Sequence, residues 1–292
     1  MTRPEPETPL ADTFDELPEP APNTALAGVD PGPAHGAYRP GLVSQMGLLI
    51  GRALPAGRTG LRLSGLARPL AVSGLKDGKA DVKALGLKLR LHPEDNLSEK
   101  RAFLTPQCFD AAELSELRAA MGPGKTFIDI GAGAGLHALV AAKAGGPAAR
   151  VIAVEPRSAL RRRLAYNARA NGLENVEISG AALSDYEGES VMRLVHGEGE
   201  AVRVTRLSTL LDEMKVARLD VMKIDTAGAE ASILAPWFAE TPRERWPGLI
   251  IMERSAGQSA ENARDALFLA CQRGYTVERE TRSNAIVRLD VS

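Results

Sequence analysis

The sequence is poor in aromatic residues, which make up only 4% of the chain, and it contains only two cysteines. With so few rings, the core has to be built mostly from Ala, Leu, Val and Ile side chains. Cys108 and Cys271 lie far apart and match no metal-binding or redox spacing, so they fit a reducing compartment. The sequence also shows no cluster of His and Asp with the spacing of metal ligands, so we expect no metal.

Long apolar runs are missing as well: no stretch approaches the ~20 residues that a membrane-spanning helix needs. The first residues, Met-Thr-Arg-Pro-Glu-Pro, lack the apolar segment of a signal peptide, so we expect a cytoplasmic protein. The net charge is only −1 at pH 7, which by itself predicts no nucleic-acid partner. With 44% hydrophobic and 25% charged residues, the composition is that of a soluble globular protein with a sizeable core.

The composition divides the chain into three parts. Residues 1–40 hold nine of the 19 prolines and carry seven acids against two bases. Such a segment cannot bury enough apolar surface to offset its ordering entropy, so we expect a disordered acidic tail. Residues 41–121 follow as a small extension of short helices and a hairpin. Residues 122–292 form the main domain.

The extension is basic, with nine bases against two acids between Arg52 and Arg90. Apolar residues at helical spacing predict an amphipathic helix over 42–54, and alternation within 82–91 predicts a half-buried strand or a hairpin. Between them we expect the glycines from Gly57 onward to break the chain into short pieces. A basic surface beside an amphipathic helix suits peripheral contact with an anionic surface through residues 41–90, although most basic runs are only solvated faces.

A lead-in helix at the end of the extension precedes the glycine turn of the main domain. Asp110 and Glu113 resemble a capping box at the start of the helix, which Gly122 ends. A short apolar strand, Phe127 to Ile130, then leads into Gly-Ala-Gly-Ala-Gly and an Ala-rich helix. Glycines at alternate positions let the backbone turn tightly and approach a ligand closely.

Strands and helices alternate from there to the end of the chain. Further buried strands are predicted at 151–154, 176–185, 220–225 and 249–253, and two more at 275–279 and 285–289. Helices are expected between them, including one over 262–273. This alternation predicts an α/β fold with a doubly wound, mostly parallel sheet of the Rossmann-like type. Such a sheet binds its ligand at the carboxyl ends of its strands.

The glycine turn discriminates between nucleotide ligands. A P-loop would need Lys and Ser or Thr after the last glycine, and a dinucleotide fold would need a glycine where Leu136 stands. The acidic Asp129 inside the strand suits a positively charged amino-acid-like ligand, and the pattern Asp-x-Gly-x-Gly-x-Gly is that of S-adenosylmethionine binding. Asp129 would contact the methionine amino group directly or through water. The candidate cofactor-binding residues of this turn are Asp129, Gly131, Ala132, Gly133 and Gly135.

Acidic residues also follow the next strands. Glu155, with Pro156 behind it, ends the second strand twenty residues after Gly135, where an acid accepts hydrogen bonds from ribose hydroxyls. Ser184 and Asp185 end the third strand, where an acid can meet the adenine amine, although Asp185 could equally cap a turn. Asp225 ends the fourth strand, as a candidate base or as the N-cap of the following helix.

Together these residues resemble the FkbM family of methyltransferases. The resemblance covers residues from about 101 to the C-terminus and rests on an ordered set of motifs: Phe127 to Gly135, Val154-Glu155-Pro156, Asn167, Asn171-Gly172, Ala182 to Asp185, Gly188, Lys223-Ile224-Asp225 with Gly228-Ala229-Glu230, and Ile251-Met252-Glu253. It implies a class I Rossmann-like fold, S-adenosylmethionine as donor, and O-methylation of a hydroxyl on a sugar, glycan, lipid or polyketide-like metabolite.

The sequence departs from the family at the fourth strand. The family usually reads Lys-Ile-Asp-Val-Glu-Gly there, and Thr226-Ala227 replaces Val-Glu, so one acid is missing. The glycine turn reads Gly-Ala-Gly where Gly-Ala-Asn is common, which does not affect cofactor binding. The first departure bears on the catalytic details and on the usual substrate.

Methyl transfer to a hydroxyl benefits from a base, because the acceptor must lose a proton. Asp225 is the first candidate for this catalytic role and Glu253 the second. We expect His137 to be packed and structural, Lys223 to pair with an acid, and Arg161 to Arg163 to form a solvated helix face. Residues 41–121 and the segment 186–206 should select the acceptor.

Two other functions stay open at this point. An NAD-dependent oxidoreductase is disfavoured by Leu136 and Asp129. A methyltransferase-fold binding protein without catalysis is suggested by Ala227. Methylation of nucleic acids is a weaker option, because the sequence lacks an Asn-Pro-Pro-Tyr type tetrad of base-flipping enzymes.

Overall fold

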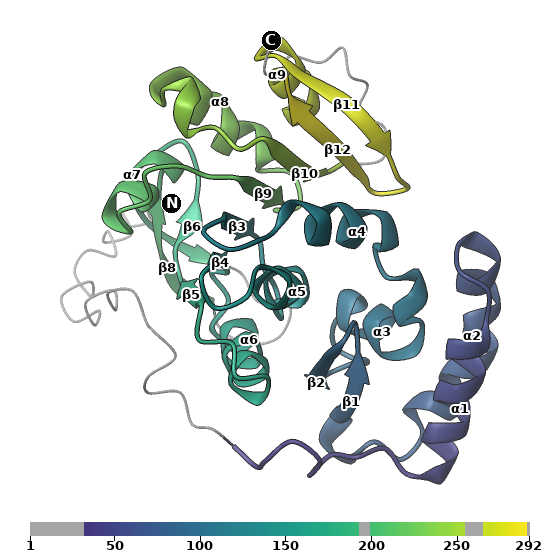
Figure 1. Ribbon diagram of the computed structural model, residues 1–292. Helices are drawn as coiled ribbons and strands as arrows, with labels where there is room; N and C mark the ends of the chain where they lie inside the picture. Colours follow the sequence, from purple (N-terminus) through teal and green to yellow (C-terminus); the bar gives the residue numbers. More distant parts are fainter. Residues whose placement is uncertain (1–31, 193–198, 255–264, 291–292) are drawn as a thin grey trace, which may run out of the picture.

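The central sheet has seven strands in the order β11-β12-β10-β9-β3-β4-β5 in the structure, a computed structural model that describes residues 32–192, 199–254 and 265–290 (Figure 1). From β5 to β10 neighbouring strands pair in parallel, and β12 is antiparallel to both β10 and β11. This confirms the expected doubly wound, mostly parallel sheet. The strands are β3 (Thr126–Ile130), β4 (Arg150–Val154), β5 (Val176–Ser179), β9 (Val221–Ile224), β10 (Leu249–Glu253), β11 (Tyr275–Glu280) and β12 (Asn284–Leu289).

Helices cover both faces of this sheet because successive residues of each strand point to opposite sides. Phe127 of β3 belongs to one apolar core and its neighbour Ile128 to the other. The first core lies under α4 (Ala111–Ala120), α5 (Leu136–Gly145) and α6 (Ser158–Ala170). The second lies under α7 (Leu207–Glu213), α8 (Glu230–Glu240) and α9 (Ala266–Gln272). The predicted helix over 262–273 is α9, and its first residues lie outside the described ones.

The third strand is shorter than expected. The prediction that it runs on to Asp185 is wrong, because the chain turns at Gly180, where Ser179 Oγ accepts a hydrogen bond from the Ala181 N–H. The next residues join a separate three-stranded sheet in the order β6-β8-β7. Its strands are β6 (Ala182–Leu183), β7 (Gly188–Met192) and β8 (Glu200–Thr205).

The N-terminal extension contains a helical hairpin, a β-hairpin and a further helix. Its elements are α1 (Leu42–Ala53), α2 (Arg58–Val72), β1 (Ala80–Ala84), β2 (Leu87–Leu91) and α3 (Leu97–Leu104), and short 3₁₀ turns lie at Lys76–Gly78, Pro106–Cys108 and, beyond the extension, Arg243–Arg245. The predicted helix over 42–54 and the β-hairpin are confirmed. None of the helices in the described ranges has both the length and the apolar character to cross a bilayer.

The expectation that glycines break the chain after residue 57 is wrong for α2, which is a continuous helix of 15 residues. Two glycines instead allow close packing. A Cβ on Gly47 of α1 would lie 2.3 Å from the Ala71 nitrogen, and one on Gly60 of α2 would lie 1.8 Å from the Pro55 carbonyl oxygen. The hairpin therefore needs glycine at these helix contacts.

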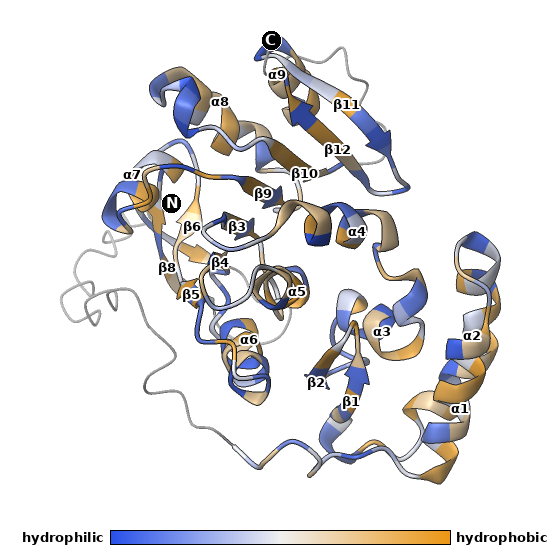
Figure 2. Ribbon diagram, viewed as in Figure 1, coloured by the Kyte–Doolittle hydropathy of each residue, from blue (hydrophilic) through white to orange (hydrophobic). Residues whose placement is uncertain are grey.

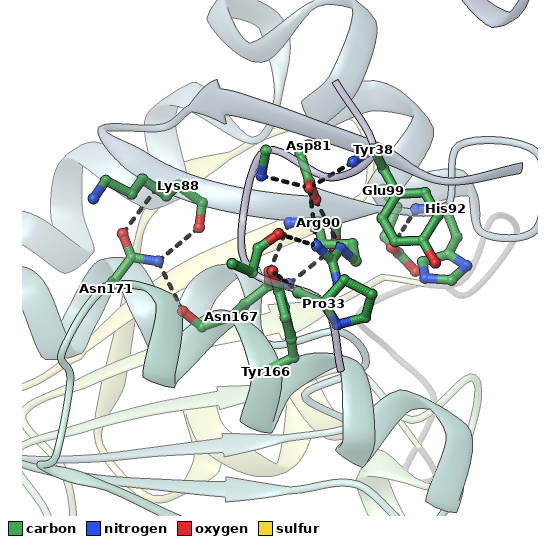
Figure 3. Close-up of polar contacts among 12 residues, drawn as sticks. Pro33, Tyr38, Asp81, Lys88, Arg90, His92, Glu99, Tyr166, Asn167 and Asn171 are labelled. Carbon is green, nitrogen blue, oxygen red and sulfur yellow. Dashed lines mark hydrogen bonds and ion pairs between the residues drawn. The ribbon is translucent and has the colours of Figure 1, made fainter. Parts of the chain in front are cut away.

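Two asparagines of α6 attach the extension to the main domain (Figure 3). Asn167 accepts a hydrogen bond from the Arg90 N–H and donates one to the Arg90 carbonyl oxygen. Asn171 does the same with the N–H and carbonyl of Lys88. The spacings of the two elements match. Asn167 and Asn171 are four residues apart on the helix, a rise of about 6 Å, and Arg90 and Lys88 are two residues apart on the strand, a rise of about 6.6 Å. One helix thus satisfies the free edge of β2.

Arg90 also anchors the segment before the extension. Its guanidinium binds Asp81 through two hydrogen bonds of 2.7 and 2.9 Å and lies 4.6 Å from the ring centroid of Tyr38 and 4.0 Å from that of Tyr166 (Figure 3). The Tyr38 N–H donates to Asp81 as well. Residues 32–40 are therefore packed against the body, which corrects the expected tail boundary at residue 40. Residues 1–31 lie outside the described part.

We expect Asn167→Ala to lower the free energy of unfolding by about 2–4 kcal/mol, because it leaves a buried N–H and a buried carbonyl of Arg90 without partners. Urea unfolding followed by circular dichroism measures the effect. Asn171→Ala is the matched control, since its bonds to Lys88 are exposed and water can replace them. Equal losses in the two variants would contradict this account of the β2 edge.

Candidate active site

The strand register gathers four charged side chains on one face of the sheet. Asp129 of β3 stands opposite Lys223 of β9. Asp225 lies two residues beyond Lys223. Ile224 of β9 and Met252 of β10 are paired in register, so the next residues of the two segments, Asp225 and Glu253, lie side by side. Because side chains alternate along a strand, all four point to the face covered by α4, α5 and α6. They meet at the carboxyl ends of the strands, where such sheets bind ligands.

Lys223 lies between two carboxylates. Its side chain is 4% exposed, and its Nζ lies 3.0 Å from Asp225 Oδ2 and 3.9 Å from Asp129 Oδ1. Burial alone would lower the pKa of Lys223, but the negative charges of Asp129 and Asp225 outweigh it and raise the pKa. The ammonium therefore stays charged, which confirms that Lys223 pairs with an acid.

Asp225 and Glu253 differ in their proton affinity. Burial opposes ionisation of Asp225, yet the adjacent Lys223 ammonium keeps the pKa of this carboxyl below its ordinary value. Glu253 has a buried Oε2 without a hydrogen-bond partner. Burial first, and then the negative charge of Asp225, raise the pKa of Glu253 to about 7. The pair therefore combines an ionised carboxylate with one that titrates near neutrality.

Asp129 lies behind the glycine turn and has no exposed surface. Its Oδ2 accepts a hydrogen bond from the Ala138 N–H in the first turn of α5, while its Oδ1 is buried without a hydrogen-bond partner. Burial raises the pKa of Asp129 more than Lys223 lowers it. In this structure Asp129 thus caps α5 and faces Lys223, and it does not reach the surface of the neighbouring cavity.

A cavity of about 570 Å³ opens over the glycine turn. This volume is in the range of small-molecule sites. Its wall combines residues after β3, β4, β6 and β9 with residues of the extension and the lead-in helix. The residues lining it include Asn96, Ser98, Phe109, Asp110, Gly131, Ala132, Gly133, His137, Glu155, Pro156, Arg157, Leu183, Met192, Lys223, Asp225 and Ala227.

The glycine turn is held tightly against the end of β9. Gly131 has a φ of +78°, and a Cβ there would lie 1.9 Å from the carbonyl oxygen of Asp225. Gly135, at φ +83°, would place a Cβ 2.4 Å from Leu164 Cγ. Gly133 differs, because a Cβ there would meet no protein atom within 4 Å. The first and last glycines therefore serve packing, and the middle one leaves open space.

Glu155 is buried and holds the turn in place. Its Oε2 accepts a hydrogen bond from the Gly133 N–H at 2.8 Å, and its Oε1 accepts from both the backbone and the side chain of Arg157. Pro156 beside it lies on the cavity wall. Ser184 and Asp185 do not line the cavity. The Ser184 hydroxyl donates to the exposed Asp185 carboxylate instead.

The lead-in helix contributes two residues that the sequence pattern assigned to other roles. Asp110 makes no side-chain cap to α4 and adopts a left-handed backbone conformation with φ +38°. It lines the cavity with its Oδ2 3.3 Å from His137 Nε2, a buried atom without a well-directed hydrogen bond. Glu113 binds Thr281 and Asn284 instead of closing a capping box. The capping-box prediction is therefore wrong, and His137 is part of the cavity wall.

The predicted solvated face of α6 is also wrong for two of its three arginines. Arg161 donates hydrogen bonds to the carbonyl oxygens of Glu155 and Pro156 beside the cavity. Arg163 pairs with the buried Glu99 of α3. The extension thus supplies partners that the helix pattern alone does not reveal.

The loop after β9 replaces the expected acid with a strained alanine. Ala227 has φ +56°, and the Glu230 carboxylate holds the loop by accepting hydrogen bonds from the N–H groups of Thr226 and Gly228. A left-handed conformation costs a non-glycine residue about 1–2 kcal/mol. Ala227 lines the cavity, so a small methyl group stands where the family usually has a glutamate side chain.

We expect Ala227→Gly to raise the free energy of unfolding by about 0.5–1 kcal/mol, because relief of the left-handed strain exceeds the added chain entropy. Thermal unfolding measures it. Ala229→Gly, two residues on at φ −92°, is the control and should be neutral or destabilising. A loss of stability in Ala227→Gly would show that the loop is not strained.

The residues present fit S-adenosylmethionine. The observations are the open space over Gly133 and a cavity wall that carries the carboxylates of Asp110 and Asp225, which suit a cationic ligand. Gly131, Gly133, Glu155 and Pro156 would hold this cofactor. In the part of the chain that the structure describes, no group of three or more His, Cys, Asp or Glu side chains could hold a metal ion.

Comparisons with solved structures give distant likenesses. They include a precorrin-6y C5,15-methyltransferase from Geobacter metallireducens (18% identity, 62% of this chain and 87% of that chain, TM-score 0.40) and a putative rRNA methylase from Clostridium thermocellum (9%, 62% and 96%, 0.43). A third is a SAM-dependent O-methyltransferase from Thermotoga maritima (14%, 62% and 66%, 0.39). No curated protein matches the chain.

The family comparison covers the site itself. Residues 129–277 match the family described as Methyltransferase FkbM domain. This range is half of the chain and contains the glycine turn, Glu155, Asp225 and Glu253. It favours the methyltransferase over the oxidoreductase alternative. The chain therefore belongs to the FkbM family of methyltransferases and uses S-adenosylmethionine as its cofactor.

Proposed function

We propose that the protein methylates a hydroxyl group of a small molecule or glycan, such as a sugar, a lipid or a polyketide-like metabolite. The observation that carries this proposal is the pair of Asp225 and Glu253 at the ends of two adjacent strands. A hydroxyl must lose its proton when it accepts a methyl group, so it needs a proton acceptor near neutral pH. Glu253, with a pKa of about 7, and its partner Asp225 meet this need.

The roles divide by position. S-adenosylmethionine, when bound, supplies a methyl group on a positively charged sulfur. Asp225 lines the cavity and would orient the acceptor hydroxyl by accepting its hydrogen bond. Glu253, behind Asp225, would take up the released proton through the pair. Lys223 keeps Asp225 ionised for this task. Much of the rate enhancement would come from holding the acceptor in line with the methyl group.

The acceptor would be selected by segments outside the central fold. Asn96, Ser98 and Asp110 come from the extension and the lead-in helix, and Met192 comes from β7. All four line the same cavity as the glycine turn. This mixed polar wall favours a polar small molecule or glycan over a nucleic acid, which would need a more basic surface around the opening.

A transfer assay with S-adenosylmethionine labelled in its methyl group tests the proposal. Hydroxylated sugars, glycolipids and polyketides serve as acceptors, and tRNA and rRNA serve as the competing class. We expect labelled product that is stable to alkali and gives an O-methyl carbon signal. Cofactor binding without transfer to any acceptor would instead support a binding protein without catalysis, and label in RNA would overturn the acceptor class.

The proton balance of Glu253 predicts two opposite pH effects. Its pKa rises from an ordinary 4.5 to about 7 on folding, so the native protein binds more protons between these values. Stability should therefore fall as the pH rises from about 4.5 to 7, while the transfer rate should rise and level off above pH 7. Urea midpoints and initial rates between pH 5 and 9 measure both.

Glu253→Gln should flatten both profiles, because the titrating group is gone. Glu278→Gln, on the exposed strand β11, is the control and should leave both profiles unchanged. If the rate transition near pH 7 survives in Glu253→Gln, another group takes up the proton.

A further inference from the structure

The helix α1 presents its apolar side to solvent. The predicted amphipathic helix exists, but its small residues Ser44, Gly47 and Gly51 pack inward together with Leu48. Ser44 donates a hydrogen bond to the Ala71 carbonyl of α2. The large apolar side chains face outward: Leu42 is 82% exposed, Leu49 72% and Met46 63%. Positions 42, 46 and 49 follow the helical period, so these side chains form one stripe.

The helix α2 continues this surface and adds charge. Leu66 is 80% exposed, and Leu63 and Leu70 are about half that. Arg58, Arg62, Leu66 and Leu70 follow at four-residue spacing and so lie along one side of the helix. Figure 2 shows both helices with hydrophobic segments at the outer edge of the molecule. We call the outward side chains of α1 and α2 the hairpin surface.

The charge on the hairpin surface has one sign. Residues 41–75 contain four arginines and no acid. Arg58 and Arg62 converge with Arg282, from the turn between β11 and β12, on a hollow of about 400 Å³. In the described ranges, no carboxylate forms an ion pair with any of these three guanidinium groups. A hollow lined by unpaired guanidinium groups suits a phosphate, because the guanidinium fork binds its oxygens bidentately.

We propose that the hairpin surface docks the protein onto a membrane surface that contains anionic phospholipids. The outward leucines and Met46 would enter the boundary between headgroups and acyl chains, and the Arg58, Arg62 and Arg282 hollow would bind a lipid phosphate. This combination of an apolar stripe and arginines is the pattern of helices that lie in the membrane interface. An acidic protein surface could pair with the arginines, but it offers no apolar layer for the exposed leucines and Met46, so the apolar stripe favours a membrane as the occupant.

The experiment uses the full chain and sedimentation with sucrose-loaded vesicles. One set contains phosphatidylcholine only and the other contains 30% phosphatidylglycerol. We expect binding to the anionic vesicles at least tenfold tighter than to the neutral ones, and weaker binding as salt rises, because each arginine near an anionic surface contributes about fivefold. Equal binding to both vesicle types, or none to either, would overturn the proposal.

Variants separate the two parts of the surface. Arg58→Glu with Arg62→Glu should remove most of the preference for anionic vesicles, and Leu49→Ser with Leu66→Ser should weaken binding to them at least tenfold. Arg118→Glu on α4 and Val191→Ser on β7 are exposed controls and should bind like the parent. All these positions are exposed, and circular dichroism checks that the variants fold.

Other occupants of the surface give different results. A dimer that Leu49→Ser with Leu66→Ser converts to monomer, without vesicle binding by the parent, would assign the surface to a second copy and overturn the proposal. Free inorganic phosphate as the true ligand of the hollow would show as protection of the protein by phosphate with no vesicle binding, which also overturns it. None of these results depends on the proposed O-methylation, because vesicle binding is measured without a methyl acceptor and the transfer assay with soluble sugars needs no membrane.

Discussion

Replacing Asp225 by Asn should lower the methyl-transfer rate by a factor of ~10²–10⁴ and leave the affinity for S-adenosylmethionine within about threefold. Asn has the size of Asp and can still accept a hydrogen bond from Lys223, whose Nζ lies 3.0 Å from the Asp225 carboxylate. What the variant loses is the negative charge that orients the acceptor hydroxyl and faces Glu253. The effect should therefore appear in the transfer step and not in cofactor binding.

Single-turnover kinetics and calorimetry with the cofactor separate these two quantities. Asp212→Asn on α7 is the control, because this exposed acid pairs with Arg245 at the surface. It should leave both quantities unchanged. An Asp225→Asn variant that transfers methyl groups at the parent rate would show that Asp225 does not orient the acceptor, and one that no longer binds the cofactor would place Asp225 in the cofactor site.

The second large effect concerns stability. Lys223→Met should lower the free energy of unfolding by about 3–5 kcal/mol, because it leaves the carboxylates of Asp129 and Asp225 without their shared cation. Asp129 is fully buried and already has one oxygen without a hydrogen-bond partner. Methionine has the length of the lysine stem, so the loss reflects the charge and not a cavity.

Urea unfolding at pH 7 measures this loss. Lys125→Met is the matched control: Lys125 also forms an ion pair, with Asp220 at 2.9 Å, but its side chain is 47% exposed. Exposed pairs contribute about 0–1 kcal/mol, so the control should stay close to the parent. A loss near 1 kcal/mol in Lys223→Met would show that water reaches the carboxylates and screens them.

The glycine turn and the positions of the strand-end acids could be predicted from local patterns in the sequence. The glycine turn with its preceding acid is a continuous stretch, and its glycines have the positive φ angles that only glycine adopts readily. The meeting of Asp225 with Glu253 follows from two short strands that lie parallel and in register. Spacing within each strand placed the two acids at strand ends, and the pairing of β9 with β10 then brought them together.

The misjudged residues have partners that are distant in the sequence. Asp110 fits a capping box by its spacing, but at the start of α4 its carboxylate faces His137 in the first turn of α5. Arg163 fits a solvated helix face, but its guanidinium forms an ion pair with the buried Glu99 of the extension. Local propensity gives way here because an unpaired buried charge costs more than a lost cap.

The hairpin of α1 and α2 shows the same limit most clearly. The helical spacing of apolar residues predicted α1, but this spacing does not tell which side of the helix faces the protein. Glycine and serine pack inward because they let the two helices approach closely, and the large side chains are left outside. By itself the sequence determined the alternating fold, the cofactor turn and the family. Only the tertiary structure decided which side chains meet at the cavity and which face the solvent, because both depend on contacts between segments far apart in the chain.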